Sequence, residues 1–340
     1  MIIDFFSKPE GNFYDCDVVI IDSKYRQFEW ANNSASILDE LAFIKNKVKT
    51  VIYVDNVDSS GFDHAKTLPI VTRYLKSQLL RDRSLYLKPL YGYRLFTDYY
   101  HEKFGIKDNQ PDWTQPILPQ YTSKMGLSWN SGLANYSLHG PLLNKIYKKI
   151  PFAGLLYYSK RFTSPKSVRK HPFSCRFGFN YNRDSVSWQR KRIHEIMKER
   201  GGFCTKKVNR RQYLNELRDS KIIVSPFGFG EITLKDFEAF MTGGVLLKPD
   251  MTHMETWPNF FQDQKTMISF AWDLSDFTEK LEYAVSNHEK LIDIAITAQE
   301  LYKKHTIGSE AGALFSTRLR TILDESLHLE ESSTHRFMEK

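Results

Sequence analysis

A glycine-rich turn in the second half of the chain has the residue types that bind a diphosphate. A short apolar strand is expected at Lys221–Val224, and the turn after it contains Gly228 and Gly230. A helical run comes next, and a second apolar strand is expected at Val245–Lys248. A turn of this kind at a helix N-terminus offers free backbone N–H groups and the positive end of the helix dipole, and its glycines let a ligand approach the backbone closely. The order strand, turn, helix and strand predicts an α/β unit with an anion site at the turn.

This α/β unit resembles the donor-binding half of glycosyltransferases with the GT-B fold, near the exostosin-like and "glycosyl transferases group 1" families. In those families a glycine loop precedes a helix that ends in Glu-Ala, and a glycine and a hydrophobic strand follow. Glu238-Ala239 matches the Glu-Ala pair, Gly243-Gly244 the glycine and Val245-Leu246-Leu247 the strand. Retaining members carry two glutamates with seven residues between them, whereas Glu231 and Glu238 have six. The close match covers roughly residues 175–290, and the first half of the chain matches in outline.

The resemblance implies an α/β protein of the GT-B class, in which two Rossmann-like domains face each other across a cleft. Alternation of strands and helices also begins near the N-terminus. Strands are expected at Asp17–Ile21 and Thr50–Val54, with an amphipathic helix at Ser34–Lys47 between them. Loops at the carboxyl ends of such strands usually carry the ligand site.

Length and composition are consistent with two domains. A chain of 340 residues with 41% hydrophobic and 14% aromatic residues can fill two cores. We expect an N-terminal acceptor-binding domain over residues 1–155 and a C-terminal nucleotide-sugar-binding domain over residues 174–325. The polar segment 151–173 is the expected connection, and Cys175–Asn180 is expected to be the first strand after it. The three cysteines are odd in number and far apart, which fits a reducing compartment.

Several charged residues match positions that contact the donor in the GT-B families. The resemblance implies that Glu238 accepts hydrogen bonds from the two ribose hydroxyls of the nucleotide, since a carboxylate has two acceptor oxygens and no competing donor. It also implies that Arg183 balances the charge of the diphosphate. Lys235, on the same helix as Glu238, is a further candidate for donor binding. Glu231 is expected either to contact the donor sugar or phosphates as part of the catalytic site or to serve as a favourable charge at a helix N-terminus.

Two carboxylates in the first half are candidates for a general base. Asp55 and Asp58 follow the strand at Thr50–Val54, and either could remove a proton from an acceptor hydroxyl. Their alternative role is turn capping, which is common for Asp. His64 and His101 are further candidates for the base.

Other residues bear on metal and acceptor binding. Asp15-Cys16-Asp17 has the Asp-x-Asp form of a metal site, but it precedes a strand instead of following one, and no Cys/His group has zinc spacing. We therefore expect no metal and no other cofactor, with the nucleotide sugar acting as a substrate. Trp129-Asn130 and the Tyr91–Tyr100 run could stack on acceptor sugars, and core packing is the alternative for the tyrosines.

Positive charge is concentrated in one region of the chain. The net charge is +8, and residues 145–211 contain nineteen Lys or Arg against three acidic residues. This region is either a solvated face or a surface for phosphates of a nucleotide donor, a lipid-linked acceptor or an anionic membrane. No nucleic-acid-binding motif accompanies it. The chain lacks an apolar run of roughly 20 residues and a recognisable signal peptide, so we expect a cytoplasmic protein, free or peripheral on the inner face of the membrane.

These observations favour a metal-independent glycosyltransferase that moves a sugar from a nucleotide-sugar donor to a carbohydrate or lipid-linked saccharide. Bacterial surface polysaccharide synthesis, of capsule or lipopolysaccharide, is the expected setting. One alternative is a phosphoryl or nucleotidyl transferase, which would need a lysine-bearing phosphate loop or paired metal-binding carboxylates. The other is a non-catalytic basic protein that binds nucleic acid or membrane.

Overall fold

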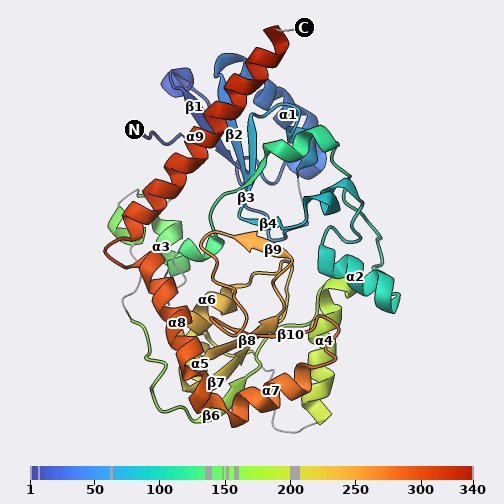
Figure 1. Cartoon of the computed structure of the whole chain (residues 1–340), viewed down its shortest axis with the longest axis vertical. Coiled ribbons are helices and arrows are strands. Elements are labelled where there is room, and N and C mark those ends of the chain that lie inside the picture. Colours follow the sequence, from blue (N-terminus) through green and yellow to red (C-terminus); the bar gives the residue numbers. More distant parts are fainter. Residues whose placement is uncertain are drawn as a thin grey trace.

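Two four-stranded parallel sheets form the centres of the two halves of the molecule (Figure 1). The computed structural model describes residues 2–6, 8–61, 64–134, 140–147, 149–150, 153–156, 161–199 and 207–338. The first sheet has the order β1-β2-β3-β5, with strands β1 (Val18–Asp22), β2 (Thr50–Asp55), β3 (Arg73–Lys76) and β5 (Met125–Leu127). Neighbouring strands in it are parallel. The first two strands lie within one residue of their predicted bounds.

The second sheet has the order β10-β8-β7-β6 and is also parallel. Its strands are β6 (His171–Ser174), β7 (Ser220–Val224), β8 (Val245–Pro249) and β10 (Ile268–Phe270). The prediction of a strand at Cys175–Asn180 is wrong, because the first strand of this sheet ends at Ser174. Its partner β7 ends at Val224 and turns into the glycine loop, so only one further residue of β7 remains for pairing beyond the Ser174–Ile223 pair.

Helices cover the faces of both sheets and connect their strands. They are α1 (Trp30–Lys47), α2 (Leu95–Phe104), α3 (Gly140–Tyr147), α4 (Asp184–Glu199), α5 (Arg210–Asp219), α6 (Leu234–Thr242), α7 (Phe277–Ser286), α8 (His288–Thr306) and α9 (Ala311–Met338). Helix α6 ends at Gly243, which adopts the left-handed conformation that favours glycine. Within the part of the chain that the structure describes, no helix has both the length and the apolar character to cross a bilayer.

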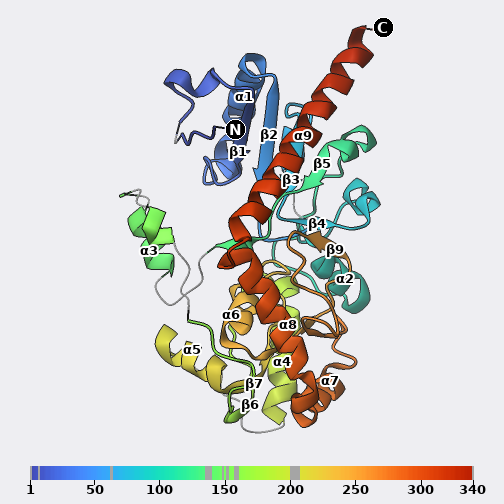
Figure 2. The ribbon, with the colours of Figure 1, turned by 60° about the vertical axis from the view of Figure 1, so that its left-hand side comes forward.

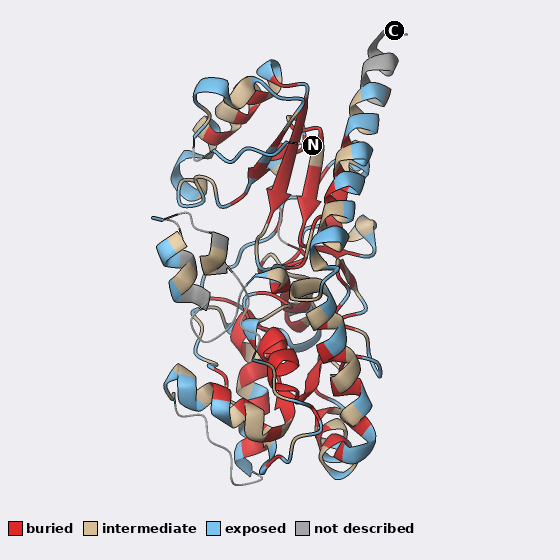
Figure 3. Cartoon of the chain, turned by 90° about the vertical axis from the view of Figure 1, so that its left-hand side faces the viewer, coloured by how far each residue is buried: buried red, intermediate tan, exposed pale blue. Residues whose placement is uncertain are grey.

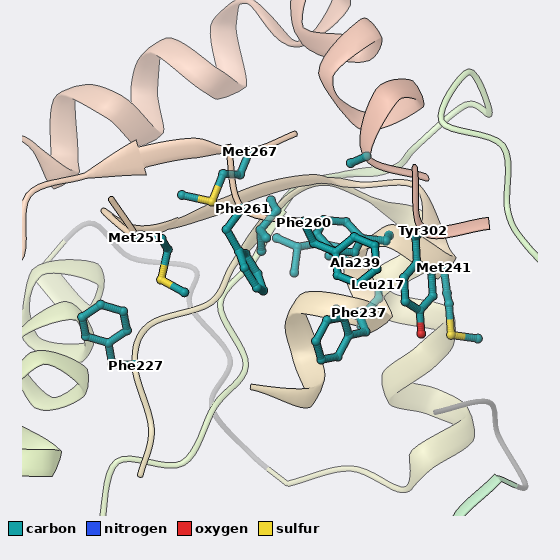
Figure 4. Packing of buried hydrophobic residues seen from close by; sticks show 14 of the residues in the cluster. Leu217, Phe227, Phe237, Ala239, Met241, Met251, Phe260, Phe261, Met267 and Tyr302 are labelled. Atoms are coloured by element: carbon teal, nitrogen blue, oxygen red, sulfur yellow. The ribbon is translucent and has the colours of Figure 1, made fainter. Parts of the chain in front are cut away.

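The strands of both sheets and much of α6 are buried, as the red ribbon in Figure 3 shows, and apolar side chains make up most of the buried residues. In the first half, residues of β1 and β2 such as Val19 and Val51 pack against Leu41 of α1. In the second half, Phe237 of α6 belongs to a cluster of aromatic and methionine side chains that also includes Phe260 and Tyr302 (Figure 4). The rings of Phe237 and Tyr302 stack with centroids 5.8 Å apart. This packing fixes α6, the helix that follows the glycine loop.

The two halves are connected by more than one crossing of the chain. Strand β4 (Gln78–Leu80) comes from the first half and pairs antiparallel with β9 (Met254–Thr256) from the second. Helix α8 packs on β8 of the second sheet, and α9 returns to pack on β2 of the first (Figures 1 and 2). There Ile322 joins a buried cluster with residues of β2 and β3. These contacts fix the position of one sheet relative to the other.

Two parallel α/β sheets, one in each half, agree with the two Rossmann-like domains of the GT-B class predicted from the sequence. Part of the connection expected at residues 151–173, including residues 157–160, lies outside the described residues. The bounds of the two domains at residues 155 and 174 stay a prediction. Parts of the basic region, including residues 200–206, also lie outside the described residues.

Candidate active site

A cavity of about 950 Å³ lies between the two halves, and we call it the interdomain cavity. Asp58 and Trp129 line it from the first half, and the glycine loop Gly228–Gly230 lines it from the second. Further lining side chains are Lys24, Asn56, Tyr181, Arg190, Phe237, His305 and Phe315. The loops after β2 and β7 both reach the cavity, so it lies at the carboxyl ends of strands from the two sheets, where ligands bind in open α/β sheets.

A buried ion pair supports the start of α6 at this cavity. The Asp236 carboxylate accepts hydrogen bonds from the backbone N–H of Thr233 at 2.8 Å and from the Ser225 hydroxyl at 2.5 Å. The Lys248 ammonium lies 3.0 Å from the same carboxylate, and neither side chain of this pair is exposed. Because Lys248 balances the charge of Asp236, the positive end of the helix dipole is not cancelled by a carboxylate.

The two glycines of the loop have different neighbours. The N–H of Gly228 donates to the carbonyl of Gly230 at 2.9 Å, which closes the turn. A Cβ atom at Gly230 would lie 1.4 Å from the carbonyl oxygen of Asp58, and one at Gly228 would lie 3.1 Å from the Arg190 guanidinium. Glycine is therefore required at position 230 for the two halves of the protein to approach each other. The predicted approach of a ligand to both glycines stays a prediction.

Sequence reasoning missed Arg190, a residue of α4 that braces the loop. This side chain is buried and donates to the carbonyls of Gly178, at 2.8 Å, and Phe227. The sequence contains a signal for it, since Val186, Arg190, Ile193 and Met197 share the buried stripe of α4 at helical spacing. A basic side chain on an apolar stripe indicates a buried set of carbonyl acceptors or an anion.

Lys235 and Glu238 lie together on α6, on a face that meets α5. Both side chains are buried. Lys235 donates to the carbonyl of Arg176, and burial lowers the pKa of its ammonium to about 8. Glu238 accepts from Arg210 at 2.9 Å and from the Tyr213 hydroxyl at 2.8 Å. Neither lines the interdomain cavity, so the structure places these two predicted donor-binding residues beside it, on the flank of α6.

Arg183 lies near the glycine loop, on the segment that leads into α4. Its guanidinium donates to the carbonyl of Gly92 at 3.2 Å and lies over the Tyr93 ring at 5.1 Å. Arg94 donates to the same carbonyl at 2.6 Å and also to the carbonyl of Phe229 in the glycine loop. Burial and the neighbouring Arg183 lower the pKa of Arg94 to about 10. Two guanidinium groups therefore meet at one side of the loop.

The two carboxylates proposed as a general base occupy different environments. Asp58 is exposed and lines the interdomain cavity. Asp55 has no exposed surface, and it accepts from Lys76 at 2.9 Å and from the Tyr74 hydroxyl at 2.5 Å. Burial acts to raise the pKa of Asp55, but Lys76, His64 and the Tyr74 hydrogen bond outweigh it and hold that pKa below its ordinary value. Asp55 is thus an ionised partner of Lys76 inside the first half.

Glu231 has no exposed surface and lies where the two halves meet. Its carboxylate accepts two hydrogen bonds from Ser60, from the N–H at 3.0 Å and from the hydroxyl at 2.6 Å. Burial acts to raise the pKa of Glu231, but His253 and the Ser60 hydrogen bonds lower it overall, so the carboxyl is ionised at neutral pH. The expected contact of Glu231 with the donor stays a prediction.

The two histidines considered as the base and the aromatic candidates also divide into residues packed inside the protein and a residue at the cavity. His64 stacks on Trp30 inside the first half, and His101 stacks on Tyr91 with its Nδ1 at 2.7 Å from the carbonyl of Ile106. Tyr91 and Tyr100 are fully buried, whereas Trp129 lines the interdomain cavity. Over the described ranges, no three His, Cys, Asp or Glu side chains are grouped to hold a metal ion.

Comparisons with known proteins give structural matches alone. No family model matches the chain, and no curated protein matches its sequence. The chain is similar to the crystal structure of TarM, with 8% identity and a TM-score of 0.40 over 88% of this chain and 54% of that one. It is also similar to the pneumococcal O-GlcNAc transferase GtfA in complex with UDP and GlcNAc, with 10% identity and a TM-score of 0.39 over 87% of this chain and 60% of that one. The chain therefore spans between half and two thirds of the length of these two structures.

Proposed function

We propose that this protein is a glycosyltransferase that moves a sugar from a nucleotide-diphosphate sugar to a carbohydrate acceptor. One observation carries the proposal: a cavity between two parallel α/β sheets has an exposed carboxylate, Asp58, on one wall and a glycine loop with a helix N-terminus on the other. A donor diphosphate at the loop and an acceptor hydroxyl beside the carboxylate would meet in this cavity. A volume of about 950 Å³ is sufficient for a nucleotide sugar.

The reaction assigns a separate role to each wall. Asp58 takes the proton of an acceptor hydroxyl, whose oxygen forms a bond to the anomeric carbon while the bond from that carbon to the diphosphate breaks. The negative charge that develops on the leaving diphosphate is stabilised by the N-terminus of α6 and by Arg183. Lys235 adds positive charge from its buried position beside the cavity. Glu238, which lies beside the cavity, would bind the ribose if the two ribose hydroxyls replace Arg210 and Tyr213 as donors to its carboxylate. The proposed reaction needs no metal. Asp58 is preferred to Asp55 as the base because it is exposed at the cavity.

The proposal also names the kind of acceptor and the place where the reaction occurs. We infer that Trp129 stacks on a sugar ring of an oligosaccharide or lipid-linked saccharide. The basic region at residues 145–211 would hold the protein at an anionic membrane, on the cytoplasmic face. The setting is the synthesis of a bacterial surface polysaccharide such as capsule or lipopolysaccharide.

A thermal-shift screen against free nucleoside diphosphates tests the donor half of the proposal. A ligand that binds the folded state raises the unfolding midpoint, and we expect a rise with at least one of them. Hydrolysis or transfer is then measured with the matching nucleotide sugars, with and without excess chelator, and the two rates should agree. Asp58→Asn should lower turnover by about 10²-fold or more. The matched control is Asp39→Asn, since Asp39 is an exposed carboxylate on α1 outside the cavity lining.

Other outcomes would support the competing functions. A midpoint that no nucleoside diphosphate changes, together with binding to anionic vesicles or nucleic acid, would favour the non-catalytic binding protein. Activity that is lost in chelator and restored by Mg²⁺ or Mn²⁺ would contradict the metal-independent reaction and favour a phosphoryl or nucleotidyl transferase.

A further inference from the structure

Glu231, in the second half of the protein, contacts the first half through Ser60. Both of its carboxylate oxygens are used by Ser60, one by the N–H at 3.0 Å and one by the hydroxyl at 2.6 Å. Glu231 and Ser60 are both fully buried. The imidazole Nε2 of His253 lies 3.7 Å from the same carboxylate. Hydrogen bonds to an ionised acceptor are stronger than those between neutral groups, so this contact is a strong one between the halves.

Ser60 is held on its other side as well. Its carbonyl accepts a hydrogen bond from the Tyr86 hydroxyl at 2.6 Å, and that hydroxyl accepts one from the N–H of Leu80 at 3.0 Å. Leu80 is the last residue of β4, the strand that pairs with β9 of the second half. Ser60 is therefore fixed between the short β4–β9 sheet and Glu231. The backbone at this point has little freedom to move relative to the second half.

Asp58, the carboxylate that faces the interdomain cavity, is two residues before Ser60. Its carbonyl accepts a hydrogen bond from Gln78 and lies against Gly230, the residue before Glu231. The segment from Asp58 to Ser60 thus contacts the second half at both ends, at Gly230 and at Glu231. The direction in which the Asp58 side chain enters the cavity depends on these contacts.

We propose that Glu231 is a positioning residue: it holds Ser60 and, through it, sets the Asp58 carboxylate at the interdomain cavity against the glycine loop. Glu231 itself does not touch the substrate in this role, because both of its oxygens are used by Ser60 and its side chain is fully buried. A reacting group must be held within a fraction of an ångström of its productive position, which explains a buried carboxylate at this point. The part that concerns turnover rests on the proposed function, whereas the part that concerns Ser60 does not.

Amide hydrogen exchange tests the structural part without any activity. The Ser60 N–H donates to Glu231, so Glu231→Ala should speed its exchange by about 10- to 100-fold, while amides of β2 keep their rates. The matched control is Glu255→Ala. Glu255 is another carboxylate that joins the two halves, through Arg83 at 3.3 Å, and it does not contact Ser60. Unchanged exchange at Ser60 in Glu231→Ala, or the same increase in Glu255→Ala, would overturn the proposal.

Turnover tests whether the effect passes through Asp58. Glu231→Ala should lower kcat by at least about 10-fold and leave the affinity for the nucleoside diphosphate unchanged, and Glu231→Gln should recover part of the loss because its amide oxygen still accepts from Ser60. In an Asp58→Asn background, Glu231→Ala should cause no further loss, because both changes remove the same group from its place. Independent, multiplicative losses would overturn the positioning role.

A milder variant covers the case in which Glu231→Ala does not fold. Ser60→Ala removes the hydroxyl donor and keeps the backbone N–H on Glu231, so it should give a smaller drop in kcat and the same dependence on Asp58. A Ser60→Ala protein with wild-type kcat and exchange would contradict the proposal. Failure of the wild-type protein to bind or use any nucleotide sugar would instead contradict the proposed function, and the exchange result would still decide the role of Glu231.

Discussion

Replacing Asp55 with Asn should destabilise the protein, whereas the same change at Asp58 should leave the fold intact. Asp55 has no exposed surface, and its carboxylate lies 2.9 Å from the ammonium of Lys76, whose side chain is 1% exposed. The variant keeps an amide oxygen for the Tyr74 hydroxyl, but it removes the negative charge that offsets a buried positive one. Asp58 is exposed and lines the cavity.

Removing one member of a buried ion pair typically costs about 3–5 kcal/mol. The lower end of this range of free energies applies to Asp55→Asn, since the amide oxygen still accepts one hydrogen bond. A loss of about 3 kcal/mol would lower the melting midpoint of a domain of this size by roughly 6–12 °C. Surface changes such as Asp58→Asn usually stay within about 0.5 kcal/mol.

Thermal unfolding of both variants and the wild type, measured across pH, decides this prediction. The pKa of Asp55 is lowered in the folded state, so its contribution to stability is present above its unfolded pKa of about 4 and is lost as the pH falls below that. The difference between wild type and Asp55→Asn should therefore be largest near neutral pH and shrink below about pH 4. A variant that melts like the wild type at pH 7 would refute the buried-pair argument. If it also lost turnover, Asp55 would replace Asp58 as the base.

Three further predictions concern the donor side. Glu238→Ala should weaken binding of the nucleoside diphosphate by about 10- to 100-fold in titration calorimetry, because a hydrogen bond to a charged group is worth roughly 1.5–3 kcal/mol. Glu238→Gln should lose less affinity. Equal affinities in the wild type and both variants would remove Glu238 from the site. Nucleotide affinity should fall as the pH rises through about 8, because Lys235 then loses the positive charge that it places beside the cavity. Lys235→Met should abolish that dependence. Gly230→Ala should lower turnover by at least about 10-fold, since its Cβ would lie 1.4 Å from the Asp58 carbonyl oxygen. Gly178→Ala is the control and should keep the wild-type turnover, because its Cβ would meet no described atom within 4 Å.

Local signals in the sequence were sufficient to predict the unit around the glycine loop. The apolar runs of β7 and β8, the turn between them and the left-handed Gly243 that ends α6 all depend on neighbours in the chain, and their bounds agree with the prediction to within one residue. The start of helix α5 also depends on a local signal, because Asn209 caps its first turn. The sequence indicates Asp58 as a candidate because it follows a strand, and Trp129 because an aromatic ring can stack on a sugar. Both line the cavity.

Contacts between distant segments could not be predicted in this way. Asp55 and Asp58 look equivalent in the sequence, and burial beside Lys76, on a different strand, is what separates them. Glu231 and Ser60 are 171 residues apart, so the sequence contains no local sign of their hydrogen bonds. The bounds of β6 were missed because the end of a strand depends on where its partner ends.

Helix α9 has a consequence for how the protein is made. Ile52, Val54 and Leu75 of the first sheet are buried together with Ile322 of α9, about 250 residues later in the chain. A ribosome adds about 5–20 residues per second, so this part of the first sheet leaves the exit tunnel roughly 12–50 s before its covering helix. During that interval an apolar strip of a parallel sheet is open to chaperones and to other nascent chains. A chain cut before α9 would keep that strip open permanently, so the first half is not a self-sufficient folding unit even though its strands are contiguous in sequence.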